Sequence, residues 1–68
     1  MKQVSGRDLA KIIQHRDWTL VRIKGSHHIF THPAHRERIV IPIHGNAPLK
    51  TGLLRSLMKI AGLSEVDL

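Results

Sequence analysis

The feature that most constrains this chain is a change of hydrophobic period, from helical to strand-like and back to helical, within 68 residues. Apolar residues near the N-terminus follow an i, i+3, i+4 spacing, which predicts a helix over residues 5–15. Runs rich in strand-forming residues follow at 18–24, 27–32 and 39–44. A second helical stripe covers residues 49–61, so the predicted element order is α-β-β-β-α.

Local signals mark the ends of these segments. Ser5 is a good N-cap for the first helix, with Asp8 three residues further on. Gly62 follows the second stripe as a C-terminal stop. Pro42 cannot donate a ladder hydrogen bond, so the third strand is expected at a sheet edge or at a bulge. We expect one α+β domain over residues 1–68, with both helices on one face of a three-stranded antiparallel sheet.

Strand alternation divides the side chains of the predicted sheet between two faces. The residues expected in the core are Val21, Ile23, Phe30, Ile39, Ile41 and Ile43. The residues expected on the open face are Arg22, Lys24, His27 and His44. Cations grouped with imidazoles suit a surface that contacts phosphate. A bulge at Gly25–Ser26 would shift the register and move His27 to the other face.

The charge of the chain agrees with a polyanionic partner. Eleven Lys and Arg against five Asp and Glu give a net charge of +6, and small basic proteins commonly bind nucleic acid. The absence of cysteine excludes disulfides, thiolate metal sites and a cysteine nucleophile. Small secreted domains usually need disulfides, so we expect a cytoplasmic location. No apolar run approaches the roughly 18 residues of a membrane span, and no membrane partner is expected.

Proton transfer near neutral pH would fall to one of the six histidines. RNA is cut without a metal when a base removes the 2′-OH proton and an acid protonates the leaving 5′-oxygen, and histidine suits either role. A strand histidine is also often a surface residue with no chemical task. His28 and His32 have ligand-like spacing but would lie about 13 Å apart on a strand. We therefore expect no metal and no other cofactor.

Three segments, in order, resemble the HicA family, the small toxins of bacterial and archaeal HicA–HicB toxin–antitoxin pairs. They are Lys24-Gly25-Ser26-His27-His28-Ile29-Phe30, the segment Ile-Val-Ile-Pro-Ile-His-Gly-Asn at 39–46, and the segment Leu-Lys-Thr-Gly-Leu-Leu-Arg-Ser-Leu-Met-Lys-Ile-Ala-Gly-Leu-Ser at 49–64. The likeness covers about residues 3–64. It implies a double-stranded-RNA-binding-domain-like fold and an endoribonuclease that cuts messenger RNA and stops translation.

The resemblance also implies roles for particular residues. The one catalytic histidine of the family lies in the Gly-Ser-His segment and maps onto His27, with Gly25 and Ser26 in the turn that presents it. The implied partner is a HicB-like antitoxin that covers His27 and shields it from RNA.

The expected RNA contacts are chosen by charge alone. They are Arg22, Lys24, His44, Lys50, Arg55 and Lys59. Lys50 lies at the start of the second helix, where the loop and the helix N-terminus could also hold a phosphate. Arg55 and Lys59 share a helix face that could instead be merely solvated.

The leading hypothesis is thus a metal-independent endoribonuclease that acts as the toxin of a type II toxin–antitoxin pair. Two alternatives stay open. One is a non-catalytic RNA-binding module of the same fold, which would bind by shape and phosphate contacts. The other is a protein-interaction domain whose basic face meets an acidic partner.

Overall fold

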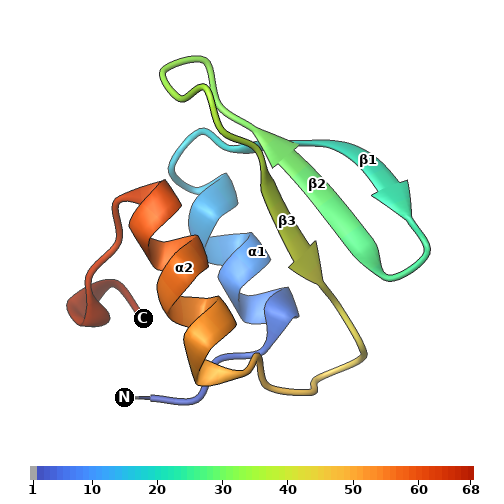
Figure 1. Ribbon diagram of the computed structural model, residues 1–68, viewed down its shortest axis with the longest axis vertical. Helices are drawn as coiled ribbons and strands as arrows, with labels where there is room; N and C mark the ends of the chain where they lie inside the picture. Colours follow the sequence, from blue (N-terminus) through green and yellow to red (C-terminus); the bar gives the residue numbers. More distant parts are fainter. Residues whose placement is uncertain (1) are drawn as a thin grey trace.

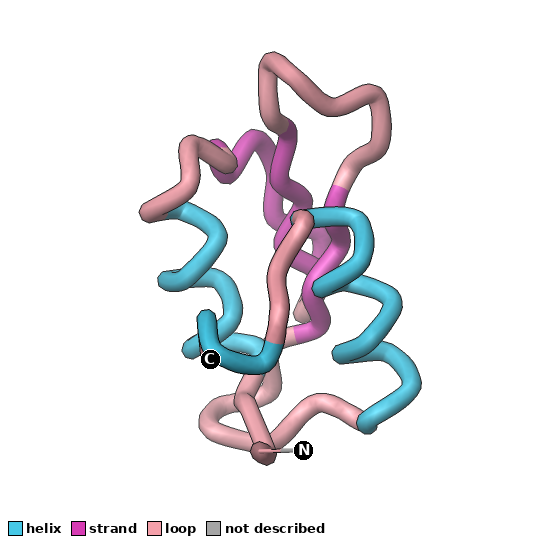
Figure 2. The backbone as a smooth tube through the Cα atoms, turned by 90° about the vertical axis from the view of Figure 1, so that its left-hand side faces the viewer, coloured by secondary structure: helices cyan, strands magenta, loops and turns pink. Residues whose placement is uncertain are grey.

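The computed structural model describes residues 2–68. Its elements are α1 (Gly6–Gln14), β1 (Thr19–Lys24), β2 (His27–Thr31), β3 (Ile39–Pro42), α2 (Thr51–Ala61) and the short 3-10 helix η1 (Glu65–Asp67). The strands form one antiparallel sheet in the order β1-β2-β3, and both α-helices lie on the same side of it (Figures 1 and 2). The predicted α+β fold and element order are confirmed.

The helix ends follow the predicted signals. The Ser5 hydroxyl accepts a hydrogen bond from the backbone N–H of Asp8 at 3.0 Å, which satisfies a donor that the first turn leaves free. Gly62 has φ of +71°, and the chain reverses there so that the N–H of Leu63 donates to the carbonyl of Met58 at 2.9 Å. This bond is characteristic of a glycine-terminated helix, so Gly62 ends α2 as expected.

The core lies between the two helices and the strands β2 and β3. The largest fully buried side chains are Phe30, Leu9, Ile13, Ile39, Ile41 and Leu54. Trp18, the residue before β1, is also buried. Its ring centroid lies 5.2 Å from that of His32 and 4.9 Å from that of His35. Core positions are thus confirmed for Phe30, Ile39 and Ile41, and Ile43 packs half-buried against them.

The expectation that Val21 and Ile23 belong to the core is wrong. Their side chains are 56% and 55% exposed. The helices pack against β3, whereas β1 forms the opposite edge of the sheet and extends beyond them (Figure 1). A bulge between Leu20 and Arg22 leaves Val21 without a register partner. β-branched residues correctly predict a strand here, but no helix covers it.

The start of α1 sits tightly against the end of β3. Gly6 is buried, and a Cβ atom added to it would overlap the carbonyl oxygen of Pro42 and lie 3.0 Å from Cγ2 of Ile41. Only glycine therefore allows this close approach of helix and strand. The N–H of Leu49 donates to the carbonyl of Val4 at 2.8 Å, which joins the segment before α1 to the segment before α2.

The C-terminal turn is tied to the end of α1 by one ion pair. Arg16 Nη2 lies 2.6 Å from Asp67 Oδ1. The backbone N–H of Ser64 donates to Asp67 Oδ2 at 2.7 Å, and this bond is the main reason that the pKa of Asp67 lies below its usual value. The Ser64 hydroxyl and the Arg16 charge lower the pKa of Asp67 further, against the opposing effect of desolvation.

Candidate functional site

A tight β1–β2 hairpin presents His27. Lys24 and His27 form the last register pair of the hairpin, and the two residues Gly25 and Ser26 connect them. Gly25 has φ of +59° while Ser26 does not have a positive φ, the pattern of a type II′ turn, in which glycine is favoured at the first central position. The turn therefore fixes the strand register and with it the face on which His27 lies.

The pairing places the two basic residues of β1 and His27 on one face of the sheet. Two neighbouring cross-strand rows make up this surface, which we call the open face: Lys24–His27–Pro42 and Arg22–Ile29–Val40. Residues paired directly across strands point to the same side, and residues two apart on a strand share that side. The open face thus carries Arg22, Lys24 and His27 together, as alternation predicts.

The opposite face of the sheet meets the helices. Phe30 and its partner Ile39 are buried, and His28 lies half-buried in the next row beside the buried Ile41. The irregularity of the sheet lies between Leu20 and Arg22 rather than at the hairpin turn, so it leaves the face of His27 unchanged.

The open face is suited to hold phosphate next to an imidazole. Arg22, Lys24 and His27 are all exposed. The salt bridge found within residues 2–68 joins Arg16 and Asp67, so no carboxylate contacts the cations of the open face in this part of the chain. Directly opposed residues of an antiparallel pair have Cα atoms about 4.5–5.5 Å apart, which allows Lys24 and His27 to reach one phosphodiester.

A small hollow adjoins this row at the edge of the sheet. It measures about 240 Å³, and its lining includes Pro42, the register partner of His27, together with His44 and Lys50. Lys50 is the N-cap residue of α2 and makes no side-chain cap bond, so N–H groups of the first helical turn remain available to an anion.

The prediction that the third strand reaches residue 44 is wrong. β3 ends at Pro42, one backbone hydrogen bond follows from the N–H of Ile43 to the carbonyl of Ser26 at 2.9 Å, and the chain then turns at Gly45 with φ of +56°. His44 is exposed in this connecting loop. Strand alternation therefore does not place His44 on the open face; what the structure shows instead is His44 beside Lys50 at the hollow.

The remaining predicted RNA contacts lie elsewhere. Arg55 and Lys59 are exposed on α2, which packs on the side of the sheet opposite His27 (Figure 2). The structure therefore does not bring them together with Arg22, Lys24 and His27.

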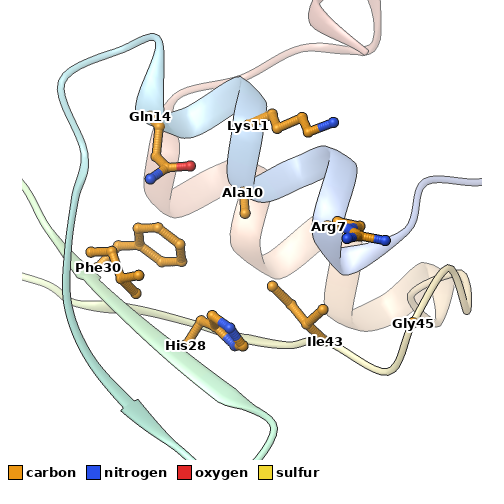
Figure 3. Close-up of a pocket in the computed structure, with 9 residues that line it drawn as sticks. Arg7, Ala10, Lys11, Gln14, His28, Phe30, Ile43 and Gly45 are labelled. Atoms are coloured by element: carbon orange, nitrogen blue, oxygen red, sulfur yellow. The ribbon is translucent and has the colours of Figure 1, made fainter.

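A groove on the helix side of the sheet was not predicted from the sequence. It measures about 420 Å³ and lies between α1 and the β1–β2 hairpin, with His28 and Phe30 facing α1 across it (Figure 3). The groove exists because α1 packs toward β3 and leaves the hairpin uncovered, a spacing that periodicity does not report. Arg7 and Lys11, which fall off the apolar stripe of α1, line the groove, but their spacing predicts only that they are exposed.

Two properties of the described residues bear on other classes of function. Residues 2–68 contain no group of three or more histidine, cysteine or carboxylate side chains placed to hold a metal ion. Among the same residues, no helix has both the length and the apolar character needed to cross a membrane.

Comparison of the sequence with models of known protein families gives a match over most of the chain. The family model described as HicA toxin of bacterial toxin–antitoxin matches residues 6–63. No curated protein matches the chain. The family match spans both α-helices, all three strands and the Gly25–Ser26–His27 segment, and thus most of the chain. The chain therefore belongs to the HicA family, the toxins of bacterial toxin–antitoxin systems.

Proposed function

We propose that this toxin is a metal-independent endoribonuclease that cuts messenger RNA in the cytoplasm, with His27 transferring protons as a general acid or base. The observation that carries the proposal is the exposed imidazole of His27 in register with Lys24 and one row from Arg22. A positioned imidazole can transfer a proton, and uncompensated cations can stabilise the charge that develops on the phosphate, two contributions to phosphodiester cleavage.

The proposed reaction uses the 2′-hydroxyl of the RNA as the nucleophile. A base removes the 2′-OH proton, the 2′-oxygen bonds to the adjacent phosphorus, and the bond from phosphorus to the 5′-oxygen breaks. A proton delivered to the leaving oxygen yields a 2′,3′-cyclic phosphate and a 5′-hydroxyl end. The His27 imidazole suits either proton transfer because a histidine can be protonated or neutral near pH 7.

Cations on the open face supply the electrostatic part of the mechanism. Negative charge accumulates on the phosphorane oxygens, where Lys24 and Arg22 stabilise it. Lys50 and His44, at the adjoining hollow, are placed to hold a neighbouring phosphate of the same strand. The net charge of +6 adds general attraction for RNA. A HicB-like antitoxin would inhibit the toxin by covering this face.

The test is cleavage of a defined single-stranded RNA by the purified protein in excess EDTA. We expect fragments that end in 2′,3′-cyclic phosphate and 5′-hydroxyl, and no cutting of the same sequence made with 2′-deoxyribose. Cleavage only after a divalent metal is restored, or equal cutting of the deoxy strand, would contradict the proposed chemistry.

A non-catalytic RNA-binding module is the second candidate. It is favoured by one observation: within the two rows of the open face His27 is the single histidine and no carboxylate is present, so no second imidazole or carboxylate is in register with it. RNA retained on the protein but left intact in the same assay would support this candidate.

A further inference from the structure

The helix-side groove, lined by Arg7, Lys11, Gln14, His28, Phe30 and Ile43 among others, is chemically divided along its length. Arg7 stands at the end near Gly45, and Gln14 stands at the other end above Phe30 (Figure 3). The two residues are seven positions apart on α1, which corresponds to about 10 Å along a helix axis. One end of the groove is therefore cationic, and the other presents an amide over an apolar surface.

The cationic end is arranged to receive an anion. No residue that lines the groove is acidic, and within residues 2–68 neither Arg7 nor Lys11 forms a salt bridge. Arg7 Nη1 lies 3.5 Å from Oδ1 of Asn46, a long contact that orients the guanidinium without neutralising its charge. A guanidinium with free N–H groups binds phosphate oxygens in a bidentate manner.

His28 adds a directed polar atom between the two ends of the groove, below Ala10 of α1 in Figure 3. Its Nδ1 lies 3.2 Å from the carbonyl oxygen of Ser26, which is a hydrogen bond when Nδ1 carries the proton. The other ring nitrogen, Nε2, is then left for a ligand in the groove, and it can accept from a hydroxyl or, when protonated, donate to a phosphate. Figure 3 shows the His28 ring beside Ile43, on the side of the groove that faces α1.

The other end of the groove suits a flat heterocycle. Its apolar lining consists of the exposed side chain of Leu20 and the buried side chains of Phe30 and Ala10. Leu20 is the register partner of Phe30 and thus lies on the same side of the sheet. The Gln14 amide beside them has both a donor and acceptors, the combination that recognises the edge of a nucleobase.

We propose that the helix-side groove is a nucleotide-binding site, with the phosphate on Arg7 and His28 and the base against Leu20 beside the Gln14 amide. The site lies across the sheet from His27 and does not require that His27 cut RNA. Its volume of about 420 Å³ falls within the usual range of small-ligand pockets, roughly 300–1,000 Å³. An acidic protein segment would satisfy Arg7 but would leave the apolar end and the Gln14 amide without a matching partner.

The experiment is a titration of the isotope-labelled protein, followed by amide and histidine-ring NMR signals. The probes are adenosine 5′-monophosphate, adenosine, inorganic phosphate and a hexaglutamate peptide. We expect the nucleotide to shift the signals of Ala10, Gln14, His28 and Phe30 in a saturable way, more tightly than adenosine or phosphate alone. A deoxyadenosine trinucleotide, which lacks the 2′-OH and cannot be cut, separates the two sources: tighter binding than the monophosphate indicates an RNA strand, and equal or weaker binding a free nucleotide.

Matched variants locate the site. Arg7→Ala should weaken nucleotide binding about tenfold or more, the usual effect of removing a hydrogen bond to a charged group. Arg36→Ala removes the same charge from an exposed loop and should leave binding within about twofold, as surface substitutions usually do. Equal losses in the two variants, or shifts confined to the open face, would overturn the proposal. So would tighter, Arg7-dependent binding of hexaglutamate, which would assign the groove to an acidic protein. His27→Ala should keep the nucleotide shifts even if cleavage is lost, which separates this proposal from the nuclease assignment.

Discussion

Ile23 and Ile41 lie in one cross-strand row, on either side of His28, yet their surroundings differ completely. Ile41, on β3, is 0% exposed beneath the helices, whereas Ile23, on β1, is 55% exposed. The same residue type on the same side of the same sheet is therefore core at one edge and surface at the other. The difference arises because α1 and α2 pack against β3 and stop short of β1.

This contrast divides the protein into two parts with separate tasks. The helices, β3 and Phe30 of β2 supply most of the buried apolar surface that stabilises the fold. The edge strand β1 and the turn end of the β1–β2 hairpin contribute little to that core and carry His27, Lys24 and Arg22 instead. A small domain buries little surface, so an exposed edge strand requires close packing in the rest of the molecule. The close approach of Gly6 to Pro42 is one example of such packing.

The largest expected effect tests the two isoleucines directly. Ile41→Ala should lower the free energy of unfolding by about 2–5 kcal/mol, because it leaves a cavity under the helices. Ile23→Ala should lower it by less than about 1 kcal/mol, since the side chain is already half exposed. Urea denaturation measures both. If Ile41→Ala does not fold, Ile41→Val, expected at about 0.5–1.5 kcal/mol, keeps the comparison measurable. Equal losses of unfolding free energy at the two positions would contradict the division of the protein into a packed part and an exposed hairpin.

Two helical glycines sharpen the comparison within the packed part. Gly6→Ala should destabilise the fold by about 1–3 kcal/mol, because the added methyl meets the Pro42 carbonyl. Gly52→Ala places the same methyl in open space on α2 and should stabilise the fold by about 0.5–1 kcal/mol. Thermal unfolding of the two variants should therefore shift in opposite directions, and a shift in the same direction would contradict the close helix–strand contact.

A third substitution tests the hairpin. Gly25→Ala should cost about 1–2 kcal/mol, because a side chain at positive φ is strained although the surrounding space is empty. Gly25→Asn should lose less, since asparagine tolerates such turns. Unfolding by urea separates the two variants, and an alanine variant as stable as the parent would argue against this turn.

The smallest expected effect is a loss of stability at low pH, when Asp67 is protonated. The pKa of Asp67 is lowered in the fold, mainly by the Ser64 backbone hydrogen bond. The ionised carboxylate therefore adds stability above the unfolded pKa, about 3.9, and this contribution is lost as the pH falls through the lower folded value. Carboxyl NMR should give a midpoint for Asp67 below the usual value. In Arg16→Ala the midpoint should rise only part of the way, because the Ser64 backbone hydrogen bond is the larger cause. A full return to the usual value would assign the effect to Arg16 instead.

Much of the architecture could be predicted from the sequence, because its signals are local. Ser5 and Gly62 marked helix ends, and strand alternation placed His27 opposite the Phe30 side. The exposure of Val21 and Ile23 could not be predicted, since alternation shows which side chains share a face and not how far a helix reaches across it.

The open face and the helix-side groove also differ in how far the sequence predicts them. The open face follows from strand period and a two-residue turn, so the grouping of Lys24 with His27 could be predicted. The helix-side groove depends on the distance between α1 and the hairpin, which packing sets. The half-buried place of His28 in that groove is therefore visible only in the structure.

The central claim is that the hairpin carries the chemistry while the packed part carries the stability. The measurement that tests it most directly is the single-turnover rate of RNA cleavage in EDTA by His27→Ala, with the unfolding free energy of the same protein. His15→Ala is the control, since it removes an exposed histidine at the end of α1. We expect His27→Ala to cut about 10²–10⁴-fold more slowly, as for the loss of a general acid or base, with stability within about 0.5 kcal/mol of the parent. Cleavage by His27→Ala at the rate of the parent and of His15→Ala would contradict the claim.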